Sequence, residues 1–390
     1  MSLPIDISKA KGRLITIDAL RGIAALSIAV AHVSGNLVVS FEQIKDSWVN
    51  ILFFPFSVGI ARVYLFFLIS GFCIHLRWCK AKATNGDTDK ALEFLPFWKR
   101  RFWRLYPTYF IALFIYILLD FALGKLIFDR FFLWDLFSHI FLIHNLDSRT
   151  VYSFNGQFWT IAIEEQLYLA YFLLMWVRIK YGWKAALSMC LLARVGWFFI
   201  TPVILTLTGI KIPAVESALA TWILWAAGAL SVEYALGIIK LPKWTASFKI
   251  GVLAIILCSI WYVYGFLYLV ETSSLMSKVW WLTAQPMWGV AFFFIINSFI
   301  SLENRELKSW QKSLLKLFAW FGIFAYSIYL MCEFVVRIAP NSHWLLRAVM
   351  TIFIAYIFHR LFERPFMNIK RRKQAYEQET IIQVPAVSVG

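Results

Sequence analysis

The chain has 390 residues, of which 61% are hydrophobic and only 15% charged, and its mean hydropathy is +0.69. Soluble domains are typically about 45–50% apolar and about 25% charged. A soluble core cannot bury this excess of apolar side chains, so the composition predicts an all-α polytopic membrane protein. It excludes a secreted disulfide scaffold, a cytosolic nucleotide-binding enzyme and a disordered interaction protein.

The formal net charge is +16, from 38 Lys and Arg against 22 Asp and Glu. A basic balance can indicate nucleic-acid binding. Here the flanking of membrane helices by cytoplasmic Lys and Arg explains it better, so the expected partner is the lipid bilayer and not nucleic acid. The five cysteines lie in or beside apolar segments without paired spacing, which predicts neither a disulfide framework nor a zinc site.

Ten apolar segments are long enough to cross a bilayer, which takes about 20 residues. The first has no cleavage site for a signal peptidase and is expected to be retained as a membrane span. Together the segments predict a membrane domain over residues 1–366, followed by a disordered cytoplasmic tail at 367–390. The segments are 14–39, 52–77, 105–124, 158–177, 185–208, 216–239, 250–270, 279–301, 314–337 and 343–363.

A shorter apolar stretch at 130–146 decides the topology, and it contains Asp135, His139 and His144. If this stretch does not cross, the N-terminus, the basic loop at 77–104 and the basic C-terminal segment share one side with most of the Lys and Arg. If it crosses, every later basic loop faces outward. The positive-inside rule therefore favours ten spans, cytoplasmic termini, and an interfacial or re-entrant helix at 130–146 on the outer side.

The first span carries three ionisable residues, which are costly in lipid and usually face a cavity inside the protein. Arg21 and His32 are eleven positions apart, so they share a helix face and lie roughly 16 Å apart along the axis. Asp18 precedes Arg21 by three positions and can pair with it. Both residues also have a structural alternative to a functional role. Arg21 could be a snorkelling side chain at the membrane boundary, and His32 could form a hydrogen bond that packs two helices.

The sequence FWKRRFWRLYP before the third span combines basic and aromatic residues. Arg101 and Arg104 are three positions apart and therefore neighbours on a helical face. Two guanidinium groups at this spacing suit bidentate binding of phosphate. Positive-inside flanking is the alternative, and it explains the charge but not the interleaved aromatic residues.

The fourth span contains two adjacent carboxylates, Glu164 and Glu165. In an apolar helix such groups need a proton, a partner or water. Trp159 lies about 8 Å from Glu164 along the axis, and Tyr168 shares its helix face. A buried ion pair between a carboxylate and an arginine is the structural alternative. In the second span, Ser70 and the glycine after it let another helix come close. Ser70 is a candidate supporting residue of the site, but helix packing by small residues explains the pair equally well.

Six fragments occur in an order that resembles the integral membrane acyltransferase-3 family: IDALRGIAALSIAVAH, FFLISGF, RRFWRLYP, FWTIAIEEQLYL, AYSIYL and FERPF. Each is weak alone, but six in order are specific. The resemblance implies an O-acyltransferase in the bacterial inner membrane, which transfers an acyl group, usually acetyl, from cytoplasmic acyl-CoA. The implied acceptor is a hydroxyl of a surface polysaccharide, such as lipopolysaccharide, or of its lipid-linked precursor. Acylation of a small molecule such as a macrolide, or transport without acyl transfer, are the alternatives.

The resemblance also assigns roles to the residues singled out above. The family's basic residue with a following histidine matches Arg21 and His32, and its paired arginines match Arg101 and Arg104. Its Trp-Glu-Tyr motif matches Trp159, Glu164 and Tyr168. One departure is that Met331, Cys332 and Glu333 stand where many relatives have a histidine.

These matches give a working mechanism. His32 is expected to act as general base on the acceptor hydroxyl, and Glu164 to orient the imidazole or bind acceptor hydroxyls. No bound cofactor or metal is expected, because a thioester is already activated. A covalent acyl-enzyme stays open beside direct transfer, although no Ser or Cys stands beside a base in a recognisable sequence pattern. The acyl-CoA phosphates are assigned to Arg21, Arg101 and Arg104, with support from Asp18, Ser70, Trp159 and Tyr168.

Overall fold

The computed structural model describes residues 14–34, 59–85, 92–270 and 272–367, and every regular element in these ranges is helical. The predicted disordered tail, apart from its first residue, lies outside the described residues. So do the end of the first predicted span and the start of the second. Within the described ranges, the prediction of an all-α protein is confirmed.

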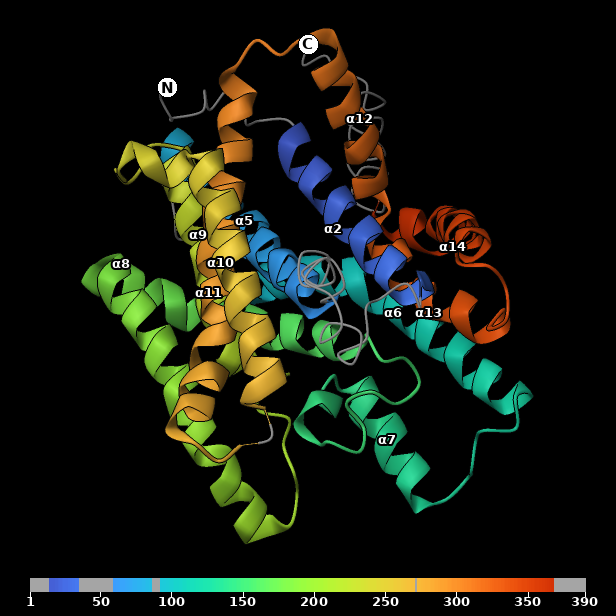
Figure 1. The fold of residues 1–390 in the computed structure, drawn as a ribbon. Helices are drawn as coiled ribbons and strands as arrows, with labels where there is room; N and C mark the ends of the chain where they lie inside the picture. The colour runs from blue at the N-terminus through green and yellow to red at the C-terminus, as the bar shows by residue number, and fades with distance from the viewer. Residues whose placement is uncertain (1–13, 35–58, 86–91, 271, 368–390) are drawn as a thin grey trace, which may run out of the picture.

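The helices follow the predicted apolar segments in chain order (Figure 1). Eight of the described helices are long and apolar enough to cross a membrane, or up to nine if the bent pair α12–α13 is one span. The elements are α2 (Ile15–Ser34), α5 (Gly59–Asn85), α6 (Phe94–Ala122), α7 (Arg130–Ile140), η3 (His144–Leu146), α8 (Trp159–Thr208), α9 (Ala218–Ala235), η4 (Lys243–Ala246), α10 (Phe248–Tyr268), α11 (Leu275–Ile300), η5 (Ser301–Asn304), α12 (Ser309–Ile323), α13 (Ala325–Ile338), α14 (Trp344–Phe358) and η6 (His359–Glu363).

The predicted fourth and fifth spans form one element, α8, of 50 residues. A straight helix of this length would extend about 75 Å, more than twice the roughly 30 Å thickness of the hydrocarbon core. At Gly182 the backbone has φ 82° and ψ 177°, a conformation essentially limited to glycine. The helix breaks there, and its two arms diverge (Figure 1). The two arms correspond to the predicted fourth and fifth spans, and the break at Gly182 lies between the predicted limits at 177 and 185.

The segment predicted as interfacial or re-entrant forms the short helix α7 and the 3-10 turn η3, and neither belongs to the candidate spans. Asp129 caps α7 by accepting a hydrogen bond from the Phe132 amide at 2.8 Å. The buried rings of His139 and His144 stack with centroids 3.9 Å apart. Burial lowers the pKa of His144 well below its usual value, and neighbouring His139 lowers it further, so a proton on this ring is disfavoured.

Two pairs of helices cross in direct backbone contact at glycines. A Cβ added at Gly71 of α5 would lie 1.9 Å from the carbonyl oxygen of Trp225 on α9, and one at Gly228 of α9 would lie 1.9 Å from that of Leu68. The helices α2 and α12 are equally close, because a Cβ at Gly322 would lie 1.9 Å from the backbone carbonyl oxygen of Asp18. These crossings set the positions of α2 and α5, both of which carry predicted site residues.

A methyl group at the α5–α9 crossing is expected to destabilise the protein. Gly228→Ala forces the two backbones apart and should cost about 1–3 kcal/mol, as overpacking does. The matched control is Gly196→Ala, because a Cβ there meets no atom within 4 Å. This control should be neutral or stabilise by about 0.5–1 kcal/mol, since alanine favours helix. Thermal unfolding in detergent measures both, and equal effects would contradict the packing argument.

Candidate functional site

A cavity of about 1000 Å³ lies between α2, α5, α6, the first arm of α8, the bent pair α12–α13 and the end of the last helix. Its wall is part aromatic and aliphatic and part charged. The polar residues that line it are Arg21, Ser70, Cys73, Lys99, Arg100, Arg101, Arg104, Thr160, Glu164, Tyr168, Tyr326, Tyr329 and Glu363.

The basic wall of the cavity comes mainly from the first turns of α6, which present Lys99, Arg100, Arg101 and Arg104. The guanidinium carbon of Arg101 lies 5.8 Å from the centre of the Tyr168 ring, in cation–π range. The buried Nε of Arg101 and one buried Nη of Arg100 have no hydrogen-bond partner among the described residues. Buried donors of this kind normally find an acceptor, so this wall is suited to an anionic ligand.

The carboxylate of Glu164 faces the same cavity and is held from two helices. Ser70 on α5 donates its hydroxyl hydrogen to Oε1 of Glu164 at 2.8 Å, and the Tyr168 hydroxyl donates to the same oxygen. The indole of Trp225 on α9 donates to the Ser70 Oγ at 3.4 Å. Both donors bind Oε1 and so orient the carboxylate, while no hydrogen bond to Oε2 is found among the described residues.

Arg21 enters the cavity from α2. Its Nη1 lies 3.2 Å from Oδ1 of Asp18, as the three-residue spacing predicts, and its Nη2 lies 2.8 Å from Sγ of Cys73 on α5. Asp18 is buried and itself does not line the cavity. It therefore supports the site through Arg21.

The structure brings most of the predicted site residues together but not all of them. His32 is exposed and is not among the residues that line the cavity. Trp159 is buried behind the wall, with its ring 6.4 Å from that of Phe67. The roles assigned to these two side chains stay predictions. The predicted residues that line the cavity are Arg21, Ser70, Arg101, Arg104, Glu164 and Tyr168.

Several residues at the cavity were given no functional role from the sequence. Cys73 looked like an ordinary apolar position. Tyr326 and Tyr329 stand in the AYSIYL fragment, which was the one available signal for them. Glu363 accepts hydrogen bonds from Ser327 at 2.5 Å and from His359 at 2.8 Å.

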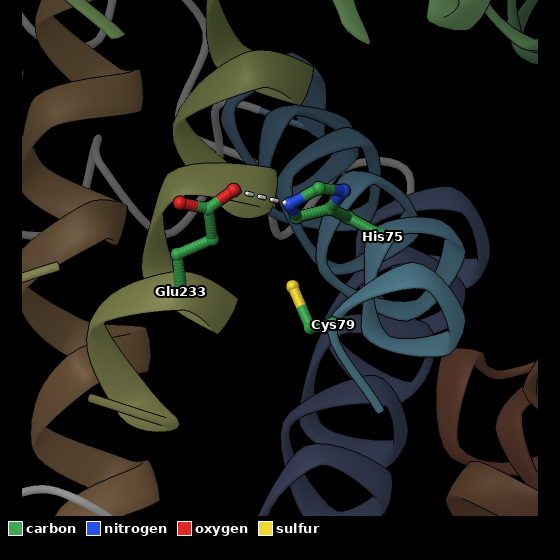
Figure 2. Close-up of side chains that lie close together, drawn as sticks. All are labelled: His75, Cys79 and Glu233. Atoms are coloured by element: carbon green, nitrogen blue, oxygen red, sulfur yellow. Dashed lines mark hydrogen bonds and ion pairs between the residues drawn. The ribbon is translucent and has the colours of Figure 1, made fainter. Parts of the chain in front are cut away.

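A second cluster of ionisable residues lies buried between α5 and α9. His75, Cys79 and Glu233 place one possible metal-ligand atom each within 4.8 Å of the others (Figure 2). The possible ligand atoms of His75 and Glu233 already have partners. His75 Nε2 lies 2.9 Å from one oxygen of Glu233, and Arg178 and Trp183 bind the other oxygen at 2.5 and 2.8 Å. The guanidinium neutralises the carboxylate and would repel a cation. The cluster is better described as a buried ion-pair network that ties α5, α8 and α9 together.

Removal of the carboxylate from this network should destabilise the protein strongly. Glu233→Ala leaves Arg178 without its counter-charge and should cost about 3–5 kcal/mol, the usual effect of breaking a buried ion pair. The loss is measured as a lower unfolding temperature in detergent. EDTA should leave the wild-type unfolding temperature unchanged. If EDTA lowered the unfolding temperature and zinc restored it, the cluster would instead hold a metal.

The fold and the cavity define a class: a polytopic helical membrane protein whose helices enclose a basic cavity with an oriented carboxylate. Residues 14–215, more than half of the chain, match the acyltransferase domain of the acyltransferase-3 family, and the chain belongs to this family. All of the predicted site residues fall within the matched range, whereas α9 to α14 lie beyond it.

One curated relative is "Acyltransferase MdmB" from Streptomyces mycarofaciens, which is 28% identical over 170 residues. The aligned part covers 43% of this chain and 40% of the relative, so the chain matches less than half of that protein's length. No solved structure matches significantly.

Proposed function

We propose that this protein is an acyl-CoA-dependent membrane O-acyltransferase that transfers an acetyl group to a hydroxyl of a carbohydrate acceptor. The observation that carries the proposal is that one cavity combines a basic wall with unpartnered N–H donors and the oriented carboxylate of Glu164. Family membership supports acyl transfer, and the basic wall supports a phosphorylated donor.

In this proposal the phosphates of acyl-CoA bind at the arginines of α6. Guanidinium groups suit phosphate because they donate two parallel hydrogen bonds and stay charged when buried. The pantetheine arm then extends into the cavity past Arg21 toward Glu164. The cavity volume of about 1000 Å³ lies at the upper end of the range for small-molecule sites, which suits an extended donor.

The acceptor hydroxyl is expected to bind near the opposite end of the donor, at Glu164. In the overall reaction, the acceptor oxygen bonds to the acyl carbon, the carbon–sulfur bond of the thioester breaks, and the hydroxyl proton leaves for a base. We assign binding of the hydroxyl to Oε2 of Glu164, and His32 remains our candidate for the base. His32 does not line the cavity. In this scheme the bound acceptor must therefore reach from Glu164 to the His32 imidazole.

The location follows from the positive-inside argument. With both termini cytoplasmic, the basic turns of α6 face the cytoplasmic pool of acyl-CoA in a bacterial inner membrane. The acceptor then arrives from the outer half of the bilayer, as a lipid-linked precursor of a surface polysaccharide would. A macrolide acceptor fits the same chemistry, and a comparison of the two acceptors in one assay distinguishes them.

Replacement of the paired arginines is expected to weaken donor binding. Arg101→Gln with Arg104→Gln should raise the KM for acetyl-CoA by at least about tenfold, because hydrogen bonds to charged groups contribute about 1.5–3 kcal/mol. Lys312→Gln is the matched control, since this exposed lysine does not line the cavity. The measurement is transfer of labelled acetyl in membranes. Transport of a substrate without any acetyl transfer would reject the proposal.

Removal of the candidate base should separate catalysis from donor binding. His32→Ala is expected to abolish acetyl transfer while the affinity for CoA stays nearly unchanged, because the imidazole lies away from the basic wall. Equilibrium binding of CoA and the rate of transfer are measured on the same preparation. An equal loss of CoA affinity would contradict this division of roles.

A further inference from the structure

Cys73 differs from the other four cysteines of the chain. All five are described and all are free thiols. Cys79, Cys190, Cys258 and Cys332 are buried, whereas Cys73 is half-buried and lines the cavity. It follows Ser70 by one helical turn on α5, so its sulfur shares a helix face with the hydroxyl that binds Glu164.

Arg21 places a positive charge at this sulfur. Its Nη2 lies 2.8 Å from Sγ, and its Nη1 is held at 3.2 Å from Asp18 on the same helix. A guanidinium fixed in this position compensates the negative charge that a thiolate carries when it attacks or leaves. None of the four buried cysteines has a hydrogen bond from a described cationic side chain.

A separate observation indicates that the thiol shares its cavity with an anionic ligand. The buried Nε of Arg101 and one Nη of Arg100 have no partner among the described residues, and both side chains line the same wall. A ligand held there by its phosphates and carrying a thioester on a long arm would present that thioester inside the cavity. Cys73 lies on the wall that such an arm passes.

We propose that Cys73 is the nucleophile of a two-step transfer, an inference that rests on the proposed function and specifies its route. In the first step the Cys73 thiolate bonds to the acyl carbon and the bond from that carbon to the CoA sulfur breaks. CoA leaves as a thiolate and takes up the proton that Cys73 had released. One thioester replaces another, so the step needs no further co-reactant.

In the second step the acceptor oxygen bonds to the acyl carbon on Cys73, and the bond to Sγ breaks. The hydroxyl proton passes to the base, and the thiolate returns to its position beside Arg21. On this route the donor and the acceptor need not occupy the cavity at the same time. A cavity of about 1000 Å³ is already at the upper end for one ligand, so donor and acceptor can use it in turn.

Ser70 is the competing nucleophile, because its hydroxyl lies 2.8 Å from a carboxylate. Its hydrogen bond, however, orients the oxygen of Glu164 that Tyr168 also binds, which is a positioning role. A thiolate is intrinsically far more nucleophilic than a serine hydroxyl, and only the thiol has a cation at its reacting atom.

The test locates the acyl group on the wild-type chain. Purified protein is incubated with acetyl-CoA labelled in the acetyl group, without acceptor, then quenched in acid and mapped by peptide mass spectrometry. The expected result is acetyl on the peptide that contains Cys73, and its release by neutral hydroxylamine, which cleaves thioesters but not ordinary oxygen esters. Because the label is found on wild-type protein, this result does not depend on whether a variant folds.

Variants then connect the label to turnover. Cys73→Ala should lose both the label and acetyl transfer while it still binds acetyl-CoA, and the matched control Cys258→Ala should keep all three. Transfer by the wild type without a label on Cys73, or full transfer by Cys73→Ala, would overturn the inference and leave the proposed function standing. A hydroxylamine-resistant label on Ser70 would overturn it in favour of the serine. Failure of the wild type to bind or consume acetyl-CoA would reject the proposed function as well.

Discussion

A charged side chain among membrane helices must find its partner inside the protein, because lipid offers neither counter-charge nor hydrogen bonds. This constraint organises the described part of the chain. Arg194 has no acidic partner in the described ranges but donates to the carbonyl oxygens of Ala220, Trp281 and Leu282 at 2.7–2.9 Å. The ion pair of Glu233 and Arg178 joins α8 to α9 in the same way. Paired with one another or with backbone carbonyl groups, such side chains connect helices.

At the cavity this satisfaction is incomplete. Arg21 and Glu164 are each oriented by neighbours, yet both still present atoms to the cavity, and the arginines of α6 have buried donors without partners. The contacts that orient these groups come from helices in direct backbone contact, with α2 on α12 and α5 on α9. Rigid crossings of this kind fix the relative positions of charges, which catalysis by positioned groups requires.

Much of this arrangement could be predicted from local spacing. The three-residue separation of Asp18 and Arg21 predicted their ion pair, and the four-residue separation of Glu164 and Tyr168 placed them on one face. The break in α8 also lies where the sequence separates two spans, because hydropathy falls around Gly182 between residues 177 and 185. The position of His32 shows the limit of the same method, since a shared helix face does not imply a shared cavity.

The sequence by itself determined the class of the protein, the approximate limits of its membrane helices and the residue pairs within one helix. These follow from composition and from the 3.6-residue period, which are local properties. Only the tertiary structure decided which helices meet. It brought Ser70 to Glu164, 94 positions away, and Arg21 to Cys73, 52 positions away. Such contacts depend on crossing points and helix rotations set by packing in three dimensions, and no periodic pattern in one segment encodes them.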